Sequence, residues 1–267
     1  MNERIEKQLS LEPKGYVKVI CSVIVLAIFL VPSIMNINFP KFNAQSINVI
    51  NKIISGFLHP EFSFLTRGDS TGLIHLMVET LAIGFLGTLI GALIALPLAF
   101  IASTNVTNKT ISFICRTIII SIRTFPLFVY AIVFISIIGP GATCGVLTIG
   151  ITSIGMLAKM FIEAIEGIDP QLLEAADALG LTLWQKCHYI IFGQLKSNFV
   201  STTIYRFDIN IKNSTALGLV GAGGIGTAIN NSIGNNNWPR FAMIIYVLII
   251  VVLIIDYLST KIRKRLV

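Results

Sequence analysis

A polar stretch at residues 201–215 lies within an otherwise apolar part of the chain. In a helix, side chains four and seven positions apart share a face, so Arg206, Asn210 and Asn213 would lie together and Asp208 could pair with Lys212. Charged groups in hydrocarbon cost several kcal/mol unless they are paired or face water. Two readings stay open: the lining of an anion's path, or a structural Arg206–Asp208 pair between helices. The candidate path residues are Arg206, Asp208, Asn210, Lys212 and Asn213.

A glycine-rich run follows at residues 217–226 and contains the pattern G-x-G-x-x-G. In dinucleotide-binding proteins this pattern needs a downstream acidic residue to hold the ribose. No acidic residue occurs between Asp208 and Asp256, so nucleotide binding is not expected. Glycines also allow close helix contact or an unwound gate near a transport path. The residues proposed for such a gate or contact are Gly221, Gly223, Gly224 and Gly226.

A short polar helix is expected at residues 170–179, between two apolar stretches. Asp169-Pro170 is a helix-start signal, and Gly180 suits the left-handed residue that ends a helix. Small and acidic side chains on this helix predict a docking surface for a soluble partner. A helix lying on the membrane is the alternative, but its acidic groups would face anionic lipid. The candidate docking residues are Asp169, Glu174, Ala175, Ala176 and Gly180.

The chain offers no group of residues suited to catalysis. The sequence has no Ser/His/Asp arrangement, no paired catalytic carboxylates and no phosphate-binding P-loop. Its three histidines are isolated, and its four cysteines lack metal-ligand spacing. We therefore expect a protein that is not an enzyme and has neither a cofactor nor a metal site. The net charge of +7 comes from residues beside apolar stretches, which favours contact with lipid headgroups rather than nucleic acid.

Composition indicates an all-α integral membrane protein. Hydrophobic residues make up 54% of the chain and charged residues only 12%, and a helix of about 20 apolar residues crosses a bilayer. The first apolar stretch follows basic residues as in a signal peptide, but it has no cleavage site and is expected to remain as an anchor. Six spans are predicted, near residues 16–36, 73–102, 112–138, 142–162, 195–217 and 240–259.

The orientation follows from the basic residues. The densest basic cluster is the tail at Lys261–Arg265, and basic residues favour the cytoplasmic side. Both termini are therefore expected inside the cell, with residues 163–194 as the largest internal loop. We divide the chain into an N-terminal part, residues 1–72, with a cytoplasmic segment, the first span and an external loop, and a transmembrane domain, residues 73–267.

The docking helix carries a resemblance to the inner-membrane permease subunits of ABC importers. Their cytoplasmic loop contains E-A-A, three residues, glycine, nine residues and I-x-L-P. This chain has Glu174-Ala-Ala, Gly180 and Ile190, and it departs from the pattern at Phe192-Gly193, where the family has Leu-Pro. In the family this EAA motif lies on coupling helices that seat in the ATPase subunit. The resemblance makes residues 170–184 the coupling helices here.

The second resemblance is narrower and concerns the phosphonate ABC transporter permeases. The run YRFDINIKNSTALGLVGAGGIG, which begins at Tyr205, is similar to their YRFEINIRxSTVLGLVGAGGIG. Further similar segments are Arg123-Thr-Phe-Pro126, KMFIEAIE at residues 159–166, and Asp256-Tyr-Leu-Ser259 with Arg263. Together these segments place the resemblance over roughly residues 73–265.

The resemblance implies a type I ABC importer permease with the MetI-like fold, located in the cytoplasmic membrane. It would work with an ABC ATPase subunit dimer, an external substrate-binding protein and a second permease chain, which could be identical or only related. Its cargo would be a phosphonate or a related oxyanion such as phosphite or phosphate. The alternative is an ion-coupled secondary transporter of a small anion that uses Asp208 or Glu163. An intramembrane enzyme would need a catalytic pair that the sequence does not offer.

Overall fold

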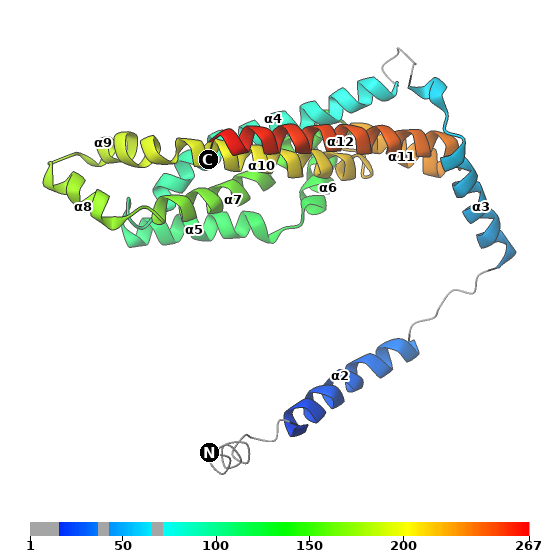
Figure 1. Cartoon of the computed structure of the whole chain (residues 1–267), viewed down its shortest axis with the longest axis horizontal. Helices are drawn as coiled ribbons and strands as arrows, with labels where there is room; N and C mark the ends of the chain where they lie inside the picture. Colours follow the sequence, from blue (N-terminus) through cyan, green and yellow to red (C-terminus); the bar gives the residue numbers. More distant parts are fainter. Residues whose placement is uncertain (1–15, 37–42, 66–71, 267) are drawn as a thin grey trace, which may run out of the picture. The chain divides into compact units, whose positions relative to one another are not determined.

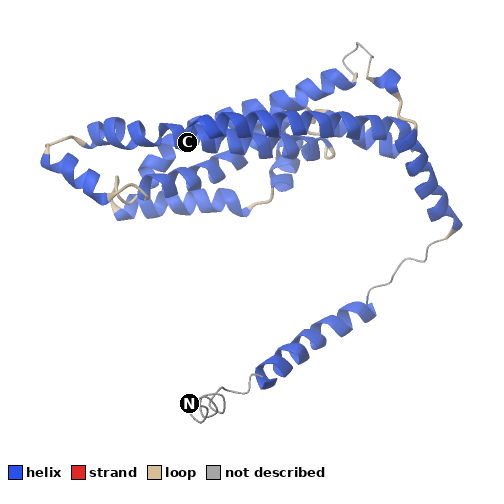
Figure 2. Ribbon diagram, in the orientation of Figure 1, coloured by secondary structure: helices blue, strands red, loops and turns tan. Residues whose placement is uncertain are grey.

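The computed structural model describes residues 16–36, 43–65 and 72–266. These residues form helices and loops without any strand (Figure 1; Figure 2), which confirms the predicted all-α class. The α-helices are α2 (Tyr16–Asn36), α3 (Ala44–Leu58), α4 (Leu73–Ala102), α5 (Lys109–Thr124), α6 (Leu127–Ile138), α7 (Ala142–Glu166), α8 (Pro170–Ala178), α9 (Leu183–Gln185), α10 (Gly193–Gly218), α11 (Ile225–Gly234) and α12 (Trp238–Leu266). Two further segments are the 3-10 turn η1 (Phe62–Phe64) and the π-helical segment η2 (Lys186–Phe192).

The chain divides into two compact units, Met1–Ile50 and Asn51–Val267. The first unit contains α2, whose length of 21 residues and apolar sequence suit a membrane span. The second unit contains the helix bundle from α4 to α12 and all the candidate site residues.

Among the described residues, four helices are long and apolar enough to cross a membrane; they belong to α2, α4, α7 and α12. The bent pair α5–α6 adds a fifth span if the two helices are counted as one. Helix α10 has 26 residues, but its sequence is too polar for it to be identified on hydropathy alone. The chain is therefore a multi-pass membrane protein, and the count of six spans stays a prediction.

The segment predicted as a span at residues 112–138 is broken instead of being one continuous helix. The segment forms two helices, α5 and α6, which meet at an angle of 84°. Pro126 has no N–H to donate and disfavours a helical conformation of the residue before it, and Phe125 is accordingly extended, with φ −80° and ψ 131°. Across the break, the Tyr130 hydroxyl donates to the Ile122 carbonyl at 2.9 Å.

Glycines let α4 approach α7 closely. A Cβ at Gly87 would lie 2.7 Å from the Ile149 side chain, and one at Gly91 would lie 2.5 Å from Ser153 Cβ. Lipid tails offer little hydrophobic driving force for helix association, so membrane helices depend on such close packing. The α4–α7 pair thereby forms the centre of the bundle, against which α10 also packs.

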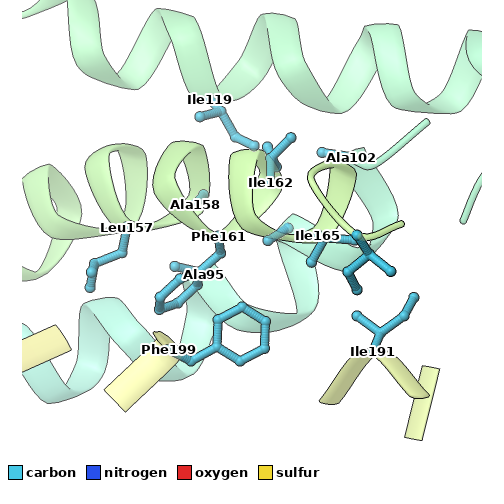
Figure 3. Packing of buried hydrophobic residues seen from close by; sticks show 12 residues of the cluster. Ala95, Ala102, Ile119, Leu157, Ala158, Phe161, Ile162, Ile165, Ile191 and Phe199 are labelled. Carbon is cyan, nitrogen blue, oxygen red and sulfur yellow. The ribbon is translucent and has the colours of Figure 1, made fainter. Parts of the chain in front are cut away.

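The largest apolar cluster lies at the end of the bundle that carries the loop of residues 163–194 (Figure 3). Phe161 of α7 and Phe199 of α10 meet there with ring centroids 4.9 Å apart. Ile168 of the loop and Ile191 of η2 are buried in the same cluster. The loop is therefore held to the transmembrane helices by its own buried residues at both ends.

Candidate functional site

The expected docking helix is present as α8, one residue shorter than predicted at its end. The Asp169 side chain accepts a hydrogen bond from the Gln171 N–H at 2.9 Å, which satisfies one of the free amides at the start of the helix. Gly180 has φ +70°, a conformation that glycine adopts without steric cost. Both end signals read from the sequence are confirmed.

The side chains of α8 divide into an exposed set and a buried one. Glu174 and Ala175 are exposed, whereas Ala176 is 1% exposed and faces the chain's own loop. Leu179 and Trp184 are exposed by 78% and 77%. Large apolar side chains next to an exposed carboxylate are typical of a protein-binding surface. The exposed face therefore includes Leu179 and Trp184, which lie within the predicted coupling segment 170–184 but were not among the individually predicted docking residues.

The second half of the loop forms a hairpin with α8. Thr182 and Gln185 form a capping box, in which each side chain bonds to the backbone N–H of the other residue. Lys186 forms an ion pair with Asp177 across the hairpin. Where the family pattern has proline, the backbone at Gly193 is helical, so η2 runs directly into α10. The departure from the motif therefore leaves α9, η2 and α10 as one connected element.

Arg206 and Asn210 point into the packing between α10, α4 and α7. The Asn210 amide donates to Thr88 Oγ1 at 2.8 Å and to Ser153 Oγ at 2.7 Å. Arg206 is 6% exposed, and its Nε donates to Ser153 Oγ at 3.4 Å, while Nη1 lies 2.9 Å from Met156 Sδ. Within the described residues Arg206 has no ion pair, so the suggested Arg206–Asp208 pair is not formed.

Asp208 and Lys212 occupy another side of α10. Lys212 Nζ lies 3.2 Å from Asp208 Oδ2, which confirms the suggested pairing. The Asp208 side chain is 8% exposed, whereas that of Lys212 is 50% exposed. Asn213 is half-buried and does not join the Arg206–Asn210 network. The five candidate path residues therefore form a buried group and a separate group that reaches the surface of this chain.

The glycine run forms an irregular loop between α10 and α11. Gly221, Gly223 and Gly224 have φ of +93°, +82° and +72°. Gly226 instead allows α11 to approach α10 closely, because a Cβ at this position would overlap the Thr215 carbonyl oxygen. The Gly221 carbonyl also accepts from the Gly141 N–H at 2.9 Å, which ties this loop to the α6–α7 turn. Close helix contact is therefore present at Gly226 and irregular backbone at the other three glycines, while the role of a gate stays a prediction.

Three residues in contact with these groups were not predicted from the sequence. Thr88 and Ser153 are buried in the structure, and their signal in the sequence is a hydroxyl side chain within an apolar stretch. Glu79 is an acidic residue in α4, and its Oε1 lies 2.9 Å from the position of a Cβ added at Gly223. The local pattern around each residue gives no indication of its partner, because each partner comes from another helix.

A family model described as "Binding-protein-dependent transport system inner membrane component" matches residues 87–267. The chain belongs to this family. Its relatives include the phosphite transport system permease protein PtxC of Stutzerimonas stutzeri, at 35% identity over 71% of this chain and 69% of that protein. The phosphate-import permease protein PhnE of Mycolicibacterium smegmatis is 34% identical over 72% of this chain and 36% of its own length. The putative phosphite permease HtxC of S. stutzeri is 30% identical over 98% of this chain and 94% of its own length.

Solved structures agree on the fold of this family member. A methionine ABC transporter, MetNI, in an inward-facing conformation matches with a TM-score of 0.64 and 22% identity, over 73% of this chain and 96% of the matched chain. A bacterial ABC transporter involved in the import of alginate matches with a TM-score of 0.63 and 15% identity, over 98% of this chain and 99% of the matched chain. The chain thus has the predicted MetI-like permease fold.

Proposed function

We propose that this family member is the membrane subunit of an ATP-driven importer that carries phosphite, phosphate or a phosphonate across the cytoplasmic membrane. The observation that carries the proposal is the set of relatives. Three permeases named for phosphite or phosphate match 71–98% of the chain at 30–35% identity. A cryptic phosphonate permease of Escherichia coli, PhnE2, is 31% identical over 45% of the chain. All of these named cargoes are phosphorus oxyanions.

In this proposal the chain contributes no catalytic residue, and two ATPase subunits hydrolyse ATP. One ATPase docks on the exposed face of α8, where Glu174 and Ala175 lie beside Leu179 and Trp184. An external binding protein delivers the oxyanion, and a second permease chain completes the path. Both termini lie in the cytoplasm, where the basic tail also meets lipid headgroups. ATP binding and hydrolysis on the ATPase docked at α8 would then switch the bundle between inward-facing and outward-facing states.

We place the anion path along the side of α10 that carries Lys212. An ammonium group that faced lipid would cost several kcal/mol. The Lys212 side chain is 50% exposed, which supports a position beside water or beside the second permease chain. Asp208, paired with it, reduces its net charge, which keeps anion binding weak enough for release. The inward-pointing Arg206 and Asn210 hold α10 to its neighbours in the present arrangement. The glycine loop, which lies against Glu79, would serve as a gate.

The deciding experiment is uptake of [³²P]phosphate into proteoliposomes that hold the chain, its candidate ATPase and its binding protein. We expect uptake to require ATP, to be competed by unlabelled phosphite or methylphosphonate, and to be lost in Glu174→Arg. Glu163→Arg makes the same charge change outside α8 and should keep uptake. Uptake that persists without the ATPase and follows an ion gradient would refute the proposal in favour of the secondary transporter.

A further inference from the structure

A cluster of polar contacts closes the base of the loop of residues 163–194. Its centre is Glu166, the last residue of α7, whose side chain is 27% exposed. The carboxylate accepts a hydrogen bond from the Thr104 N–H at 2.7 Å and another from the Thr104 hydroxyl. It also forms an ion pair with Arg116 of α5. Glu166 therefore joins the end of α7 to both the α4–α5 connection and α5.

Arg116 is itself held by the end of α4. Its Nε donates to the Ala102 carbonyl at 3.0 Å and to Ser112 Oγ at 3.2 Å, and the Ser112 hydroxyl donates to the same carbonyl. Carbonyls at a helix end lack an intrahelical partner, so these two donors provide hydrogen bonds for the Ala102 carbonyl at the end of α4. Asn105 does the same for α7, because its Nδ2 donates to the Ile165 carbonyl at 2.8 Å. The ends of α4 and α7 are thus fixed to each other.

The position of Glu166 in the chain gives this cluster its significance. Asp169, which caps α8, follows three residues later, and Ile168 between them is buried in the apolar cluster. Only two residues, Gly167 and the buried Ile168, therefore separate Glu166 from the cap of α8. On the other side, α5 runs from Arg116 to its break at Phe125, where the bent α5–α6 pair changes direction. The ion pair joins the end of α7, which leads into α8, to α5, the first helix of this bent pair.

We propose that the Glu166–Arg116 ion pair is a transmission contact, through which movement of α8 is passed to α5 and the bent α5–α6 pair. Glu166 is a positioning residue in this role, since it acts through its contacts with Thr104 and Arg116. The proposal rests on the proposed function, because it takes α8 as the ATPase-docking helix. A charge-assisted contact between two helices keeps them together during a movement in which helices held by packing alone would slide past each other.

The chain offers a matched control in the same helix. Lys159 and Glu163 form an ion pair at 3.2 Å, with side chains 51% and 62% exposed. Both residues belong to α7, so this pair links no other element. A variant that removes its carboxylate makes the same chemical change one turn away from Glu166 without breaking a contact between helices.

The test measures ATP hydrolysis and [³²P]phosphate uptake together in the proteoliposomes described above. We expect Glu166→Gln and Arg116→Gln to lower the phosphate carried per ATP about fivefold, a size typical of a single coupling contact. Glu163→Gln should leave the ratio unchanged. The double exchange of Glu166→Arg with Arg116→Glu should restore part of it. An unchanged ratio in Glu166→Gln, or uptake and hydrolysis that fall in equal proportion, overturns the proposal.

A second measurement separates this proposal from the choice of cargo. Nitroxide labels at Gln171 of α8 and Ser136 of α6 report the distance between the two helices as ATP binds to the complex. We expect an ATP-dependent change in the parent protein and in Glu163→Gln, and a smaller change in Glu166→Gln. This result would support the transmission contact even if phosphate uptake failed. The same change in all three proteins would refute it, whatever the cargo.

Discussion

At the scale of single residues, the proposed path gives Lys212 a role that Lys159, another lysine paired with a carboxylate, does not have. Lys212→Met removes the ammonium group, whereas Lys212→Arg keeps a positive charge at the same place. Because hydrogen bonds to charged groups contribute roughly 1.5–3 kcal/mol, we expect Lys212→Met to lower phosphate uptake about tenfold or more, and Lys212→Arg to keep most of it. The measurement is the initial rate of [³²P]phosphate uptake at fixed ATP.

The control for Lys212 is Lys159→Met, since Lys159 also pairs with a carboxylate four residues away but lies in α7. Its uptake should match that of the parent protein. Equal losses in the two methionine variants would show that uptake responds to any lost charge on this chain, and the path would then have to be placed elsewhere.

At the scale of helices, the α4–α7 contact depends on the absence of a side chain at Gly91. A side chain there would overlap Ser153 and approach the Gly150 carbonyl oxygen, which lies 3.0 Å from the Cβ position. Overpacking typically costs 1–3 kcal/mol, so Gly91→Leu should lower the melting temperature in detergent by about 5 °C or more. Gly193→Ala is the control, because nothing lies within 4 Å of its Cβ position. A stable Gly91→Leu protein would contradict the close packing.

Helix α8 depends on its cap more than the long spans do, because short helices are marginally stable alone. Asp169→Ala removes the hydrogen bond to Gln171 and should cost about 1 kcal/mol. We expect faster amide exchange at the start of α8 and a lower ATPase rate in the complex, with little change in melting temperature. Asp169→Ser keeps an acceptor and should behave like the parent protein. Unchanged exchange in Asp169→Ala would show that the loop holds α8 without its cap.

The elements that sequence reasoning predicted well are those whose signals are local. Asp169 and Gly180 mark the two ends of α8 within twelve residues, and each acts on its own stretch of backbone. The 84° break at Phe125-Pro126 was harder to predict, because proline is tolerated within α4 at Pro97. Proline alone does not determine whether a membrane helix bends or continues, since neighbouring helices can satisfy the freed backbone groups.

Long-range pairings could not be predicted from the pattern. Arg116 and Glu166 are separated by 50 residues, and nothing near either one indicates the other. The same is true of Asn210 with Thr88 and Ser153, which only the packing of three helices brings together. A helical wheel of α10 placed Arg206 and Asn210 on one face, and they do share Ser153. It could not show whether that face meets neighbouring helices or water.

At the scale of the whole molecule, we predict the orientation in the membrane from the basic tail and from the six predicted spans. We expect the chain to keep both ends in the cytoplasm, since basic residues resist translocation. Cysteine labelling can test this in a variant whose four native cysteines are replaced by alanine. In intact cells, Asn51→Cys on the external segment should react with a membrane-impermeant maleimide, whereas Lys264→Cys in the tail should react only after the cells are opened.

The two positions together distinguish the possible span counts. Both are exposed in the structure, so a failure to react reports the membrane and not burial. Labelling of Lys264→Cys in intact cells would place the tail outside and would put residues 163–194, with α8, on the wrong side for an ATPase. Labelling of neither residue in intact cells would place both inside, and this requires an even number of crossings between them in place of the five predicted. The expected pattern, with only Asn51→Cys labelled, leaves α8 facing the cytoplasm, as the proposed coupling requires.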